Sequence, residues 1–376
     1  MLPVLEDMLA GRGSVLPVPS DDQRETSLLT TSLRADAEID DDVAVVVSTS
    51  GTTGVPKGAM LTAAALVASA QATHRRLGGP GRWLLALPAH HVAGLQVLVR
   101  SVVAGTVPVA VSPSFDAAEL SSAVADLGAG RRYVALVASQ LDKALSDPGA
   151  SAALASLDGV LIGGGPMPAG VAEKASAASI PVVRTYGMSE TAGGCVYDGI
   201  PLDGVRVRID DGAGRPATSG QGRVTLGGPT LAKGYRNPVS PDPFSEPGWF
   251  RTDDIGAVDD SGVLTVLGRV DDAISTGGLT VLPQLVEAAL ASHTAVADCA
   301  VFGVPDARLG QRVVAAVVVT PGGATPTLAE LRDHVASRLD TTAAPREVHV
   351  VEEIPRRGIG KVDRRDLATR FGVPSA

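Results

Sequence analysis

The sequence Ser48-Thr-Ser-Gly-Thr-Thr-Gly-Val-Pro-Lys-Gly58 follows directly on the apolar run 43–47, a pattern typical of a strand that opens into a loop. Its glycines let the backbone approach an anion closely, while the hydroxyl groups and the ammonium of Lys57 add donors and positive charge. The loop is not a Walker A loop, because Pro56 stands where that pattern requires Gly. It is either an ordinary surface loop or, as we expect, a polyphosphate site. The candidate phosphate-binding residues are Ser48, Thr49, Ser50, Gly51, Thr52, Thr53, Gly54 and Lys57.

Short apolar runs alternate with segments of helical period between residues 43 and 190. This alternation predicts an α/β fold with a mostly parallel sheet covered by helices on both faces. The expected strands are 43–49, 83–87, 106–111, 133–137, 159–162 and 181–185, and the expected helices are 62–77, 92–103, 116–127 and 168–178.

The pattern changes twice toward the C-terminus. Between about 195 and 268, short alternating runs lie between Gly, Pro and Asp clusters and predict a small β-rich subdomain. After Asp271 a small α+β unit follows, in which Thr327 and Glu330 form a capping box at the start of a helix. We therefore expect a large N-terminal domain over 1–270 and a small mobile C-terminal domain over 271–376. Residues 1–40 show little periodicity and have no assigned role.

The composition excludes several classes of protein. A chain of 376 residues with 45% hydrophobic residues can bury the cores of two or three domains. The net charge of −9 argues against a general nucleic-acid or anionic-membrane binder, and two cysteines are too few for a disulfide framework or a zinc ribbon. No apolar run approaches the ~20 residues of a membrane span, and Glu6 and Asp7 stand where a signal peptide needs positive charge. We expect a cytoplasmic protein with no membrane span.

The loop at 48–58 closely resembles the phosphate-binding signature of the adenylate-forming acyl-CoA ligase superfamily. Members of that family make an acyl-AMP from a carboxylate and ATP, and most then transfer the acyl group to CoA. The resemblance implies a small-molecule carboxylate, ATP and CoA as binding partners, with Mg²⁺ as the metal. It covers residues 43 to about 366, and the chain is short for the family, which implies that the usual N-terminal subdomain is reduced.

The sequence Tyr186-Gly-Met-Ser-Glu-Thr191 resembles a second motif of the family. The resemblance implies that Tyr186 stacks on adenine, that Ser189 meets a phosphate and that Glu190 holds Mg²⁺. Hard carboxylate oxygens suit this metal, which triphosphate chemistry requires. Small residues before this motif resemble the adenine-side loop of the family. The further members of the AMP-binding set are Gly163, Gly164, Gly165, Pro166, Gly187 and Met188.

Two consecutive segments resemble the ribose-binding and hinge motifs. In Trp249-Phe-Arg-Thr-Asp-Asp254 the match implies that Asp254 binds the ribose hydroxyls, with Asp253 standing where a Gly is usual. In Gly268-Arg-Val-Asp-Asp272 it implies that Arg269 is a second ribose contact and that Asp271 is the pivot between the domains. The residues that help to admit CoA are then Gly277 and Gly278.

Two further resemblances supply the remaining catalytic residues. Pro355-Arg-Arg-Gly-Ile-Gly-Lys361 resembles the C-terminal Gly-Lys motif, in which Lys361 reaches the carboxylate and the α-phosphate; without the family it is an exposed basic patch. Leu87-Pro-Ala-His-His-Val-Ala-Gly94 resembles the segment whose histidine lines the acyl pocket, which implies that role for His91. The alternative is a structural histidine at a helix start. The expected catalytic residues are Lys361, Glu190 and His91.

Arg100 is the only charge in the apolar helix expected over 92–103, and Gln96 lies one turn before it on the same face. A buried charge is costly unless paired, so we expect Arg100 to meet a carboxylate. That carboxylate belongs either to the protein or to a substrate with a second carboxylate, contacted directly or through water. The expected substrate-binding residues are His91, Arg100, Gly164 and Ser189.

Three alternatives to a CoA ligase for a substrate with two carboxylates stay open. They are another aryl- or short-acyl-CoA ligase, a carrier-protein adenylation enzyme, and a non-catalytic nucleotide-binding protein. Cys195 has no base near it in the sequence, so a catalytic thiol is not expected. The sequence leaves the oligomeric state open, with a homodimer among the options.

Overall fold

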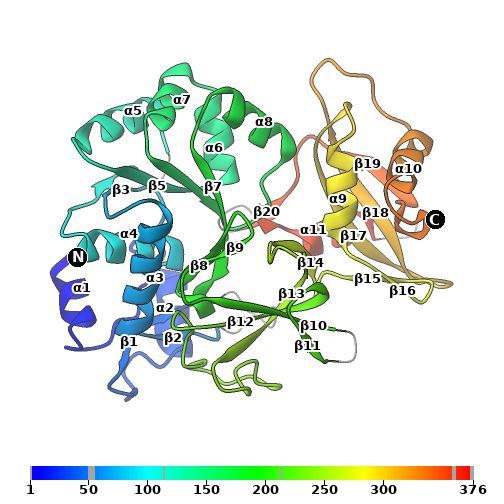
Figure 1. Ribbon diagram of the computed structural model, residues 1–376. Coiled ribbons are helices and arrows are strands. Elements are labelled where there is room, and N and C mark those ends of the chain that lie inside the picture. Colours follow the sequence, from blue (N-terminus) through cyan, green and yellow to red (C-terminus); the bar gives the residue numbers. More distant parts are fainter. Residues whose placement is uncertain (1, 50–55, 113–114, 212–213, 358–360, 373–376) are drawn as a thin grey trace.

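The computed structural model describes residues 2–49, 56–112, 115–211, 214–357 and 361–372. It has a large part that contains most of the helices and a smaller part, yellow to red, beside it (Figure 1). The expected α/β class, with a large N-terminal and a small C-terminal domain, is confirmed. The boundary predicted at residue 271 falls between two consecutive strands, β14 and β15.

A seven-stranded sheet forms the centre of the large part, in the order β4-β3-β5-β6-β7-β8-β9. The first four pairings are parallel and the last two are antiparallel, so the sheet is mostly parallel as expected. The strands are β3 (Arg82–Leu85), β4 (Val109–Ala110), β5 (Arg132–Val137), β6 (Gly159–Gly163), β7 (Val182–Met188), β8 (Gly193–Tyr197) and β9 (Ile200–Pro201).

Helices cover both faces of this sheet because successive side chains of each strand point to opposite faces. Leu84 and Val134 pack on one face against α5 to α8, whereas Trp83 and Tyr133 pack on the other. Two of these helices, α6 and α7, are absent from the sequence predictions. The helices are α3 (Ala63–Arg76), α4 (Val92–Val103), α5 (Ala117–Asp126), α6 (Ala138–Leu145), α7 (Pro148–Ala155) and α8 (Ala169–Ala177).

The first expected strand does not join the parallel sheet. Strand β1 (Val43–Val47) pairs antiparallel with β2 (Ala59–Thr62) in a sheet of its own. The run is apolar throughout and all five residues are buried, so its hydrophobicity cannot reveal its partner. Residues 1–40 contain two helices that the sequence analysis did not assign, α1 (Leu2–Leu9) and α2 (Gln23–Ser32).

A five-stranded antiparallel sheet, in the order β11-β10-β12-β13-β14, confirms the expected β-rich region. Its longest strand, β13, carries the Trp249–Asp254 motif and was not predicted as a strand. Buried positions of β13 include Thr252 and Asp254, which conceal the usual apolar alternation. The strands are β10 (Arg206–Asp210), β11 (Pro216–Ala217), β12 (Gly220–Gly227), β13 (Trp249–Val258) and β14 (Leu264–Arg269).

The smaller part has its own core around Val301, Ala315 and Leu331. The expected capping box is present, since the Thr327 hydroxyl accepts from the Glu330 amide at 3.2 Å and the Thr327 amide donates to the Glu330 carboxylate at 2.7 Å. The elements are β15 (Ile274–Thr276), β16 (Leu279–Val281), α9 (Pro283–Ala291), β17 (Val296–Asp306), β18 (Gly310–Val319), α10 (Leu328–Ala336), β19 (Glu347–Val350), β20 (Arg356–Arg357), β21 (Lys361–Val362) and α11 (Arg364–Phe371), with short 3₁₀ turns at η1 (Ser189–Thr191) and η2 (Thr341–Ala343).

Among the described residues, no helix combines the length and the apolar character needed to cross a membrane.

Candidate active site

The carboxyl end of β7 carries the Tyr186 motif. Because ligands of open parallel sheets bind outside the carboxyl ends of the strands, this end is the expected place for a site. The Tyr186 hydroxyl donates a hydrogen bond to Oδ2 of Asp254 at 2.6 Å, which joins the sheet of β7 to the sheet of β13. Burial, followed by the charge of Asp254, raises the pKa of Tyr186 well above its ordinary value, so the phenol stays a donor.

Asp254 and its neighbour Asp253 point to opposite sides of β13. Asp254 is 6% exposed and accepts a second hydrogen bond, from Nη1 of Arg269 at 3.3 Å. Asp253 forms an ion pair with Arg223, and its Oδ2 also lies 3.7 Å from Nη2 of Arg269. Burial raises the pKa of Asp254, and the hydrogen bond from Tyr186 opposes that effect. The geometry therefore leaves Asp254 facing Tyr186 and gives Asp253 a separate partner.

Arg269 links the ribose motif to the expected hinge. Its Nη2 donates to Oδ2 of Asp271 at 2.8 Å, while Nη1 bonds Asp254 on the neighbouring strand. Asp254 and Arg269 are directly paired in the register of β13 and β14. The nucleotide-side carboxylate and the predicted pivot thus share one guanidinium.

Glu190 lies in the 3₁₀ turn that follows β7 and is 8% exposed. Its Oε1 accepts a hydrogen bond from the Tyr235 hydroxyl at 2.6 Å, and its Oε2 has no hydrogen-bond partner among the described residues. Mg²⁺ is commonly bound by one or two protein carboxylates together with substrate phosphates and water. A buried carboxylate with one oxygen free fits that use, although no group of three or more His, Cys, Asp or Glu among the described residues could enclose a metal alone.

The phosphate-binding loop is described only at its two ends. Thr49 follows β1, and its buried Oγ1 has no hydrogen-bond partner among the described residues, so a ligand could accept a hydrogen bond there. At the other end, Lys57 places its Nζ 5.3 Å from the ring centroid of Tyr235. Ser48, which precedes Thr49, is also among the described residues. The remaining predicted residues of this loop, Ser50, Gly51, Thr52, Thr53 and Gly54, lie outside the described residues.

The expected adenine-side loop follows β6, the neighbour of β7. A Cβ at Gly163 would lie 2.6 Å from Oγ1 of Thr185, so this position requires the absence of a side chain. Gly164 has φ +81°, in the left-handed region. Gly187 is equally restricted, because a Cβ there would lie 2.1 Å from the carbonyl oxygen of Gly193. Gly165, Pro166, Met188 and Ser189 lie in the same two segments.

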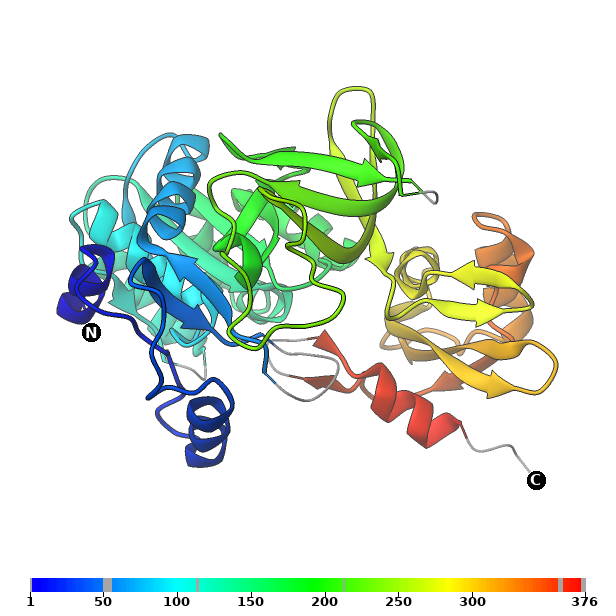
Figure 2. The same cartoon turned by 90° about the horizontal axis from the view of Figure 1, so that it is seen from below.

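His91 and Lys361 approach each other across the junction of the two parts. His91 stands at the N-cap position of α4 without a side-chain capping bond, and its pKa is lowered by burial, then by His90 and then by the positive charge of Lys361. Lys361 lies on β21, in the short β20–β21 hairpin at this junction (Figure 2). The predicted C-terminal lysine therefore lies within electrostatic range of the predicted acyl-pocket histidine.

Arg100 is buried, at 3% exposure, and has no protein carboxylate within ion-pair distance among the described residues. Its guanidinium lies 4.9 Å from the ring centroid of Trp83, and its Nη2 contacts the Tyr197 hydroxyl at 3.4 Å. Two buried polar atoms here have no hydrogen-bond partner in the described part of the chain: Nε of Arg100 and Oε1 of Gln96, on residues one helical turn apart. A structural ion pair, one of the two expected roles of Arg100, thus finds no partner in the described part of the chain.

Gly277 and Gly278 do not join the other predicted residues. Both have positive φ, +58° and +83°, and form the two-residue turn between β15 and β16. That hairpin belongs to the smaller part and extends away from the large one in both views (Figures 1 and 2).

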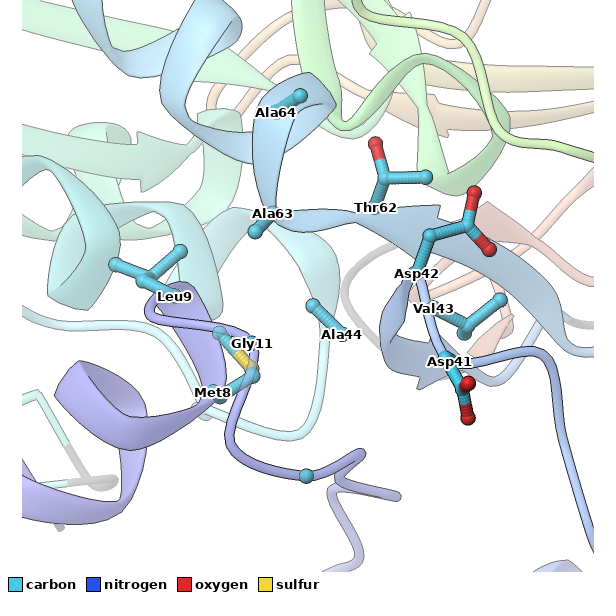
Figure 3. Close-up of a pocket in the computed structure, with 11 residues that line it drawn as sticks. Met8, Leu9, Gly11, Asp41, Asp42, Val43, Ala44, Thr62, Ala63 and Ala64 are labelled. Carbon is cyan, nitrogen blue, oxygen red and sulfur yellow. The ribbon is translucent and has the colours of Figure 1, made fainter.

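Figure 3 shows a cavity of about 540 Å³ near the N-terminus that does not belong to this site. It lies between α1 and the β1–β2 pair, and none of the predicted site residues lines it.

Sequence reasoning did not identify Tyr235 or Arg223, which contact Glu190 and Asp253 respectively. Tyr235 is one of only four tyrosines, and it lies in Lys233-Gly-Tyr-Arg-Asn237 after a Gly- and Pro-containing stretch. That rarity is a weak signal, and only the fold brings this segment to the phosphate-binding loop.

Two family models match most of the chain. The family model described as AMP-binding enzyme matches residues 9–236, and the model of the AMP-binding enzyme C-terminal domain matches residues 285–361. The chain is 65% identical over 376 residues to a probable 2-succinylbenzoate–CoA ligase of Mycobacterium tuberculosis, covering 99% of this chain and 95% of that one. It is 35% identical to the 2-succinylbenzoate–CoA ligase of Bacillus licheniformis, covering 87% and 70% respectively.

Two solved structures superpose on most of the chain. The o-succinylbenzoate CoA synthetase of Bacillus subtilis, in complex with its acyl-adenylate intermediate, superposes with a TM-score of 0.76 at 27% identity, over 97% of this chain and 80% of that one. ATP-bound MatB from Rhodopseudomonas palustris superposes with a TM-score of 0.78 at 27% identity, over 90% and 69%. Since a family model matches more than half of the chain and a full-length relative is 65% identical, the chain belongs to the AMP-binding enzyme family.

Proposed function

We propose that the protein is an ATP-dependent CoA ligase that activates o-succinylbenzoate. The reaction passes through an acyl-adenylate and yields o-succinylbenzoyl-CoA, AMP and diphosphate, a step of menaquinone biosynthesis. The similarity to ligases with this printed activity, at 65% identity over nearly the full length, supports this substrate above other acids.

One observation supports the ligase chemistry: side chains from separate segments interact around the Tyr186 motif and across the junction of the two parts. Tyr186 donates a hydrogen bond to Asp254. Tyr235 donates to Glu190, and its ring lies beside the ammonium of Lys57. Burial lowers the pKa of His91, and the positive charge of Lys361 lowers it further. These are the groups that an acyl-adenylation needs for base, ribose, phosphates and carboxylate. A protein that only binds nucleotide has no use for Lys361 beside the acyl end of the site.

In the first half-reaction an oxygen of the succinyl carboxylate attacks the α-phosphorus of ATP, and the bond to the diphosphate leaving group breaks. Lys57 and Thr49 bind phosphate oxygens, and Lys361 stabilises negative charge that develops between the carboxylate and the α-phosphate. Glu190 holds Mg²⁺, which supplies charge neutralisation on the phosphates when bound. Asp254 and Arg269 hold the ribose, and Tyr186 packs on adenine.

In the second half-reaction the CoA thiol attacks the acyl carbon, AMP leaves and the thiol proton is released. We propose that the C-terminal domain, 271–376, turns about Asp271 between the two steps. The position of the Gly277–Gly278 turn supports this, because the hairpin that carries it extends away from the nucleotide residues in the present arrangement. The Arg269–Asp271 ion pair would have to adjust during that rotation.

The ring carboxylate of o-succinylbenzoate is the proposed partner of Arg100, directly or through water. Its guanidinium is already desolvated and has no protein carboxylate in the described residues, so an anion there would gain a charge-assisted interaction. Gln96 is buried in α4, one helical turn before Arg100 and toward His91 at the start of the helix. Its Oε1 has no hydrogen-bond partner among the described residues.

The test is the release of AMP and diphosphate by the purified protein with ATP, Mg²⁺, CoA and o-succinylbenzoate, with benzoate and fatty acids as controls. Thioester formed only from o-succinylbenzoate would support the proposal. Turnover of other acids alone would leave a ligase of another specificity. ATP–diphosphate exchange without a CoA-dependent product would favour a carrier-protein adenylation enzyme.

We place this activity in the cytoplasm, where ATP and CoA are available. Assembly as a homodimer stays an open option, which light scattering of the purified protein would decide.

A further inference from the structure

Tyr235 contacts both of the groups that are expected to handle the triphosphate. Its hydroxyl donates to Oε1 of Glu190 at 2.6 Å, and the ammonium of Lys57 lies 5.3 Å from the centroid of its ring. Phe244 packs edge-on against the same ring, with centroids 5.4 Å apart. The tyrosine is buried, so its orientation is fixed by packing as well as by the hydrogen bond.

The backbone around Tyr235 fastens the same two regions together. Strand β2 and the residues before it exchange hydrogen bonds with segment 232–237: the Met60 amide donates to the Gly234 carbonyl at 3.0 Å, and the Arg236 amide donates to the Gly58 carbonyl at 2.8 Å. The Asn237 amide donates to the Lys57 carbonyl at 2.9 Å. On the other side, the Ala232 amide donates to the Glu190 carbonyl at 2.9 Å. Segment 232–237 therefore bridges the end of the phosphate-binding loop and the turn that carries Glu190.

We propose that Tyr235 is a positioning residue for the adenylation step: its hydroxyl orients the metal-binding carboxylate of Glu190, and its ring orients Lys57, so that the metal and phosphate contacts keep a fixed spacing. This rests on the proposed function, in which Glu190 holds Mg²⁺ and Lys57 binds phosphate. Tyr235 itself touches neither ATP nor metal in this assignment.

The chemistry of the phenol suits this use. A phenol O–H is a hydrogen-bond donor, and here it donates to Oε1 of Glu190 at 2.6 Å. A donor on Oε1 fixes the carboxylate plane and leaves Oε2 available to a metal. The hydroxyl and the ring act on different partners, and two substitutions can separate them.

The test measures binding of α,β-methylene-ATP, which cannot form the adenylate, by calorimetry with Mn²⁺ and again with EDTA. Tyr235→Phe keeps the ring against Lys57 and removes the donor to Glu190, whereas Tyr235→Leu removes both. Tyr133→Phe is the matched control, because Tyr133 is also buried and its hydroxyl donates to the carbonyls of Leu77 and Gly79, away from the site. Thermal unfolding of each variant checks that the fold is kept.

Wild type is expected to bind the nucleotide more tightly with Mn²⁺ than with EDTA. Tyr235→Phe should weaken Mn²⁺-dependent binding by about tenfold and leave binding in EDTA unchanged, as expected for one lost hydrogen bond to a charged group. Tyr235→Leu should weaken both, and Tyr133→Phe neither.

A double-mutant cycle assigns the effect to Glu190. In a Glu190→Gln background, Tyr235→Phe should cause little further loss of Mn²⁺-dependent binding. Equal loss with and without Mn²⁺ in Tyr235→Phe, or additive losses in the cycle, would overturn the inference while the proposed function stands. If wild type gains nothing from Mn²⁺, the placement of the metal in the proposed function fails, and the inference fails with it.

Discussion

Replacing Arg100 by methionine is expected to stabilise the fold while removing substrate discrimination. The guanidinium is 3% exposed and has no carboxylate partner in the described part of the chain, and burial lowers its pKa. A desolvated, unpaired cation costs several kcal/mol. Against that cost stand a cation–π contact with Trp83 at 4.9 Å, about 2 kcal/mol when desolvated, and a long 3.4 Å contact with Tyr197 that contributes little.

Methionine is uncharged and unbranched and can replace the aliphatic stem of arginine, although it is three heavy atoms shorter, so it removes the desolvation cost and loses the cation–π contact with Trp83. The net expectation is a gain of about 1–3 kcal/mol, comparable with replacements of buried ion pairs by apolar residues. For a large part of about 270 residues, 1 kcal/mol corresponds to roughly 2 °C, so Tm should rise by about 2–5 °C. Arg75→Met is the matched control: Arg75 forms an exposed ion pair with Asp203 at 2.7 Å, and its loss should change the free energy of unfolding by less than about 1 kcal/mol.

The functional half of this prediction compares two acids, o-succinylbenzoate and 4-oxo-4-phenylbutanoate, which lacks only the ring carboxylate. If Arg100 binds that carboxylate, wild type should prefer the first acid by about 10- to 100-fold in kcat/KM, as expected for a charge-assisted hydrogen bond, and Arg100→Met should lose the preference. A variant that discriminates as wild type does would refute the substrate role. A fall in Tm of several degrees would refute the energetic argument independently.

Three other predictions follow from the site. Lys361→Ala should reduce acyl-adenylate formation, followed by ATP–diphosphate exchange, by about 10²-fold or more, while thioester formation from supplied acyl-adenylate is retained; equal loss of both would contradict its assignment. Asp254→Asn should raise the KM for ATP by about tenfold or more, because it weakens the contacts with Tyr186 and the ribose, whereas Asp253→Asn should change it little; the reverse order in initial-rate measurements would exchange their roles. Burial, with the charge of Arg100, lowers the pKa of His74 to about 4 from 6.5, so the unfolded chain binds more protons between these values and stability falls as pH decreases through this window. The loss should be about 2 kcal/mol at pH 5 relative to neutral pH and should shrink in His74→Phe; a Tm of wild type that is independent of pH in this range would exclude it.

The sequence predicts best where one physical signal determines an element. The helix expected over 92–103 agrees with α4 at both ends, because its apolar residues are continuous. The Tyr186 motif begins inside β7 and continues past its carboxyl end, and the ribose motif lies in the first part of β13. The roles that the resemblance implies for these residues stay predictions. Asp254 could also be distinguished from Asp253 by the two-residue period of a strand, once the segment is known to be one.

The sequence predictions failed where contacts between distant segments determine the structure. An apolar strand such as β1 is compatible with several neighbours, and only the fold shows that it pairs with β2. In β13 the buried face contains Thr252 and Asp254, so a pattern based on hydrophobicity does not detect the strand. Tyr235 lies 45 positions from Glu190 and has no local feature that links them. Asp254 and Tyr235 occupy positions that the proposed site requires, and for that reason they do not follow the hydrophobic patterns from which strands are predicted.

Buried charged side chains without an ion-pair partner are the groups to which we assign ligands in the proposed function. Among the described residues, Asp, Glu, Lys and Arg are buried at only a few positions, and Asp254 and Asp210 each have an arginine within 3.3 Å. Glu190 and Arg100 have no opposite charge, only a tyrosine hydroxyl and an aromatic ring. A charge held in this way is costly in the free protein and is worth keeping if a ligand supplies the missing partner. In the proposed function the partner of Glu190 is a cation and that of Arg100 is an anion, and a metal-bound triphosphate and a dicarboxylic acid would provide both in a single reaction.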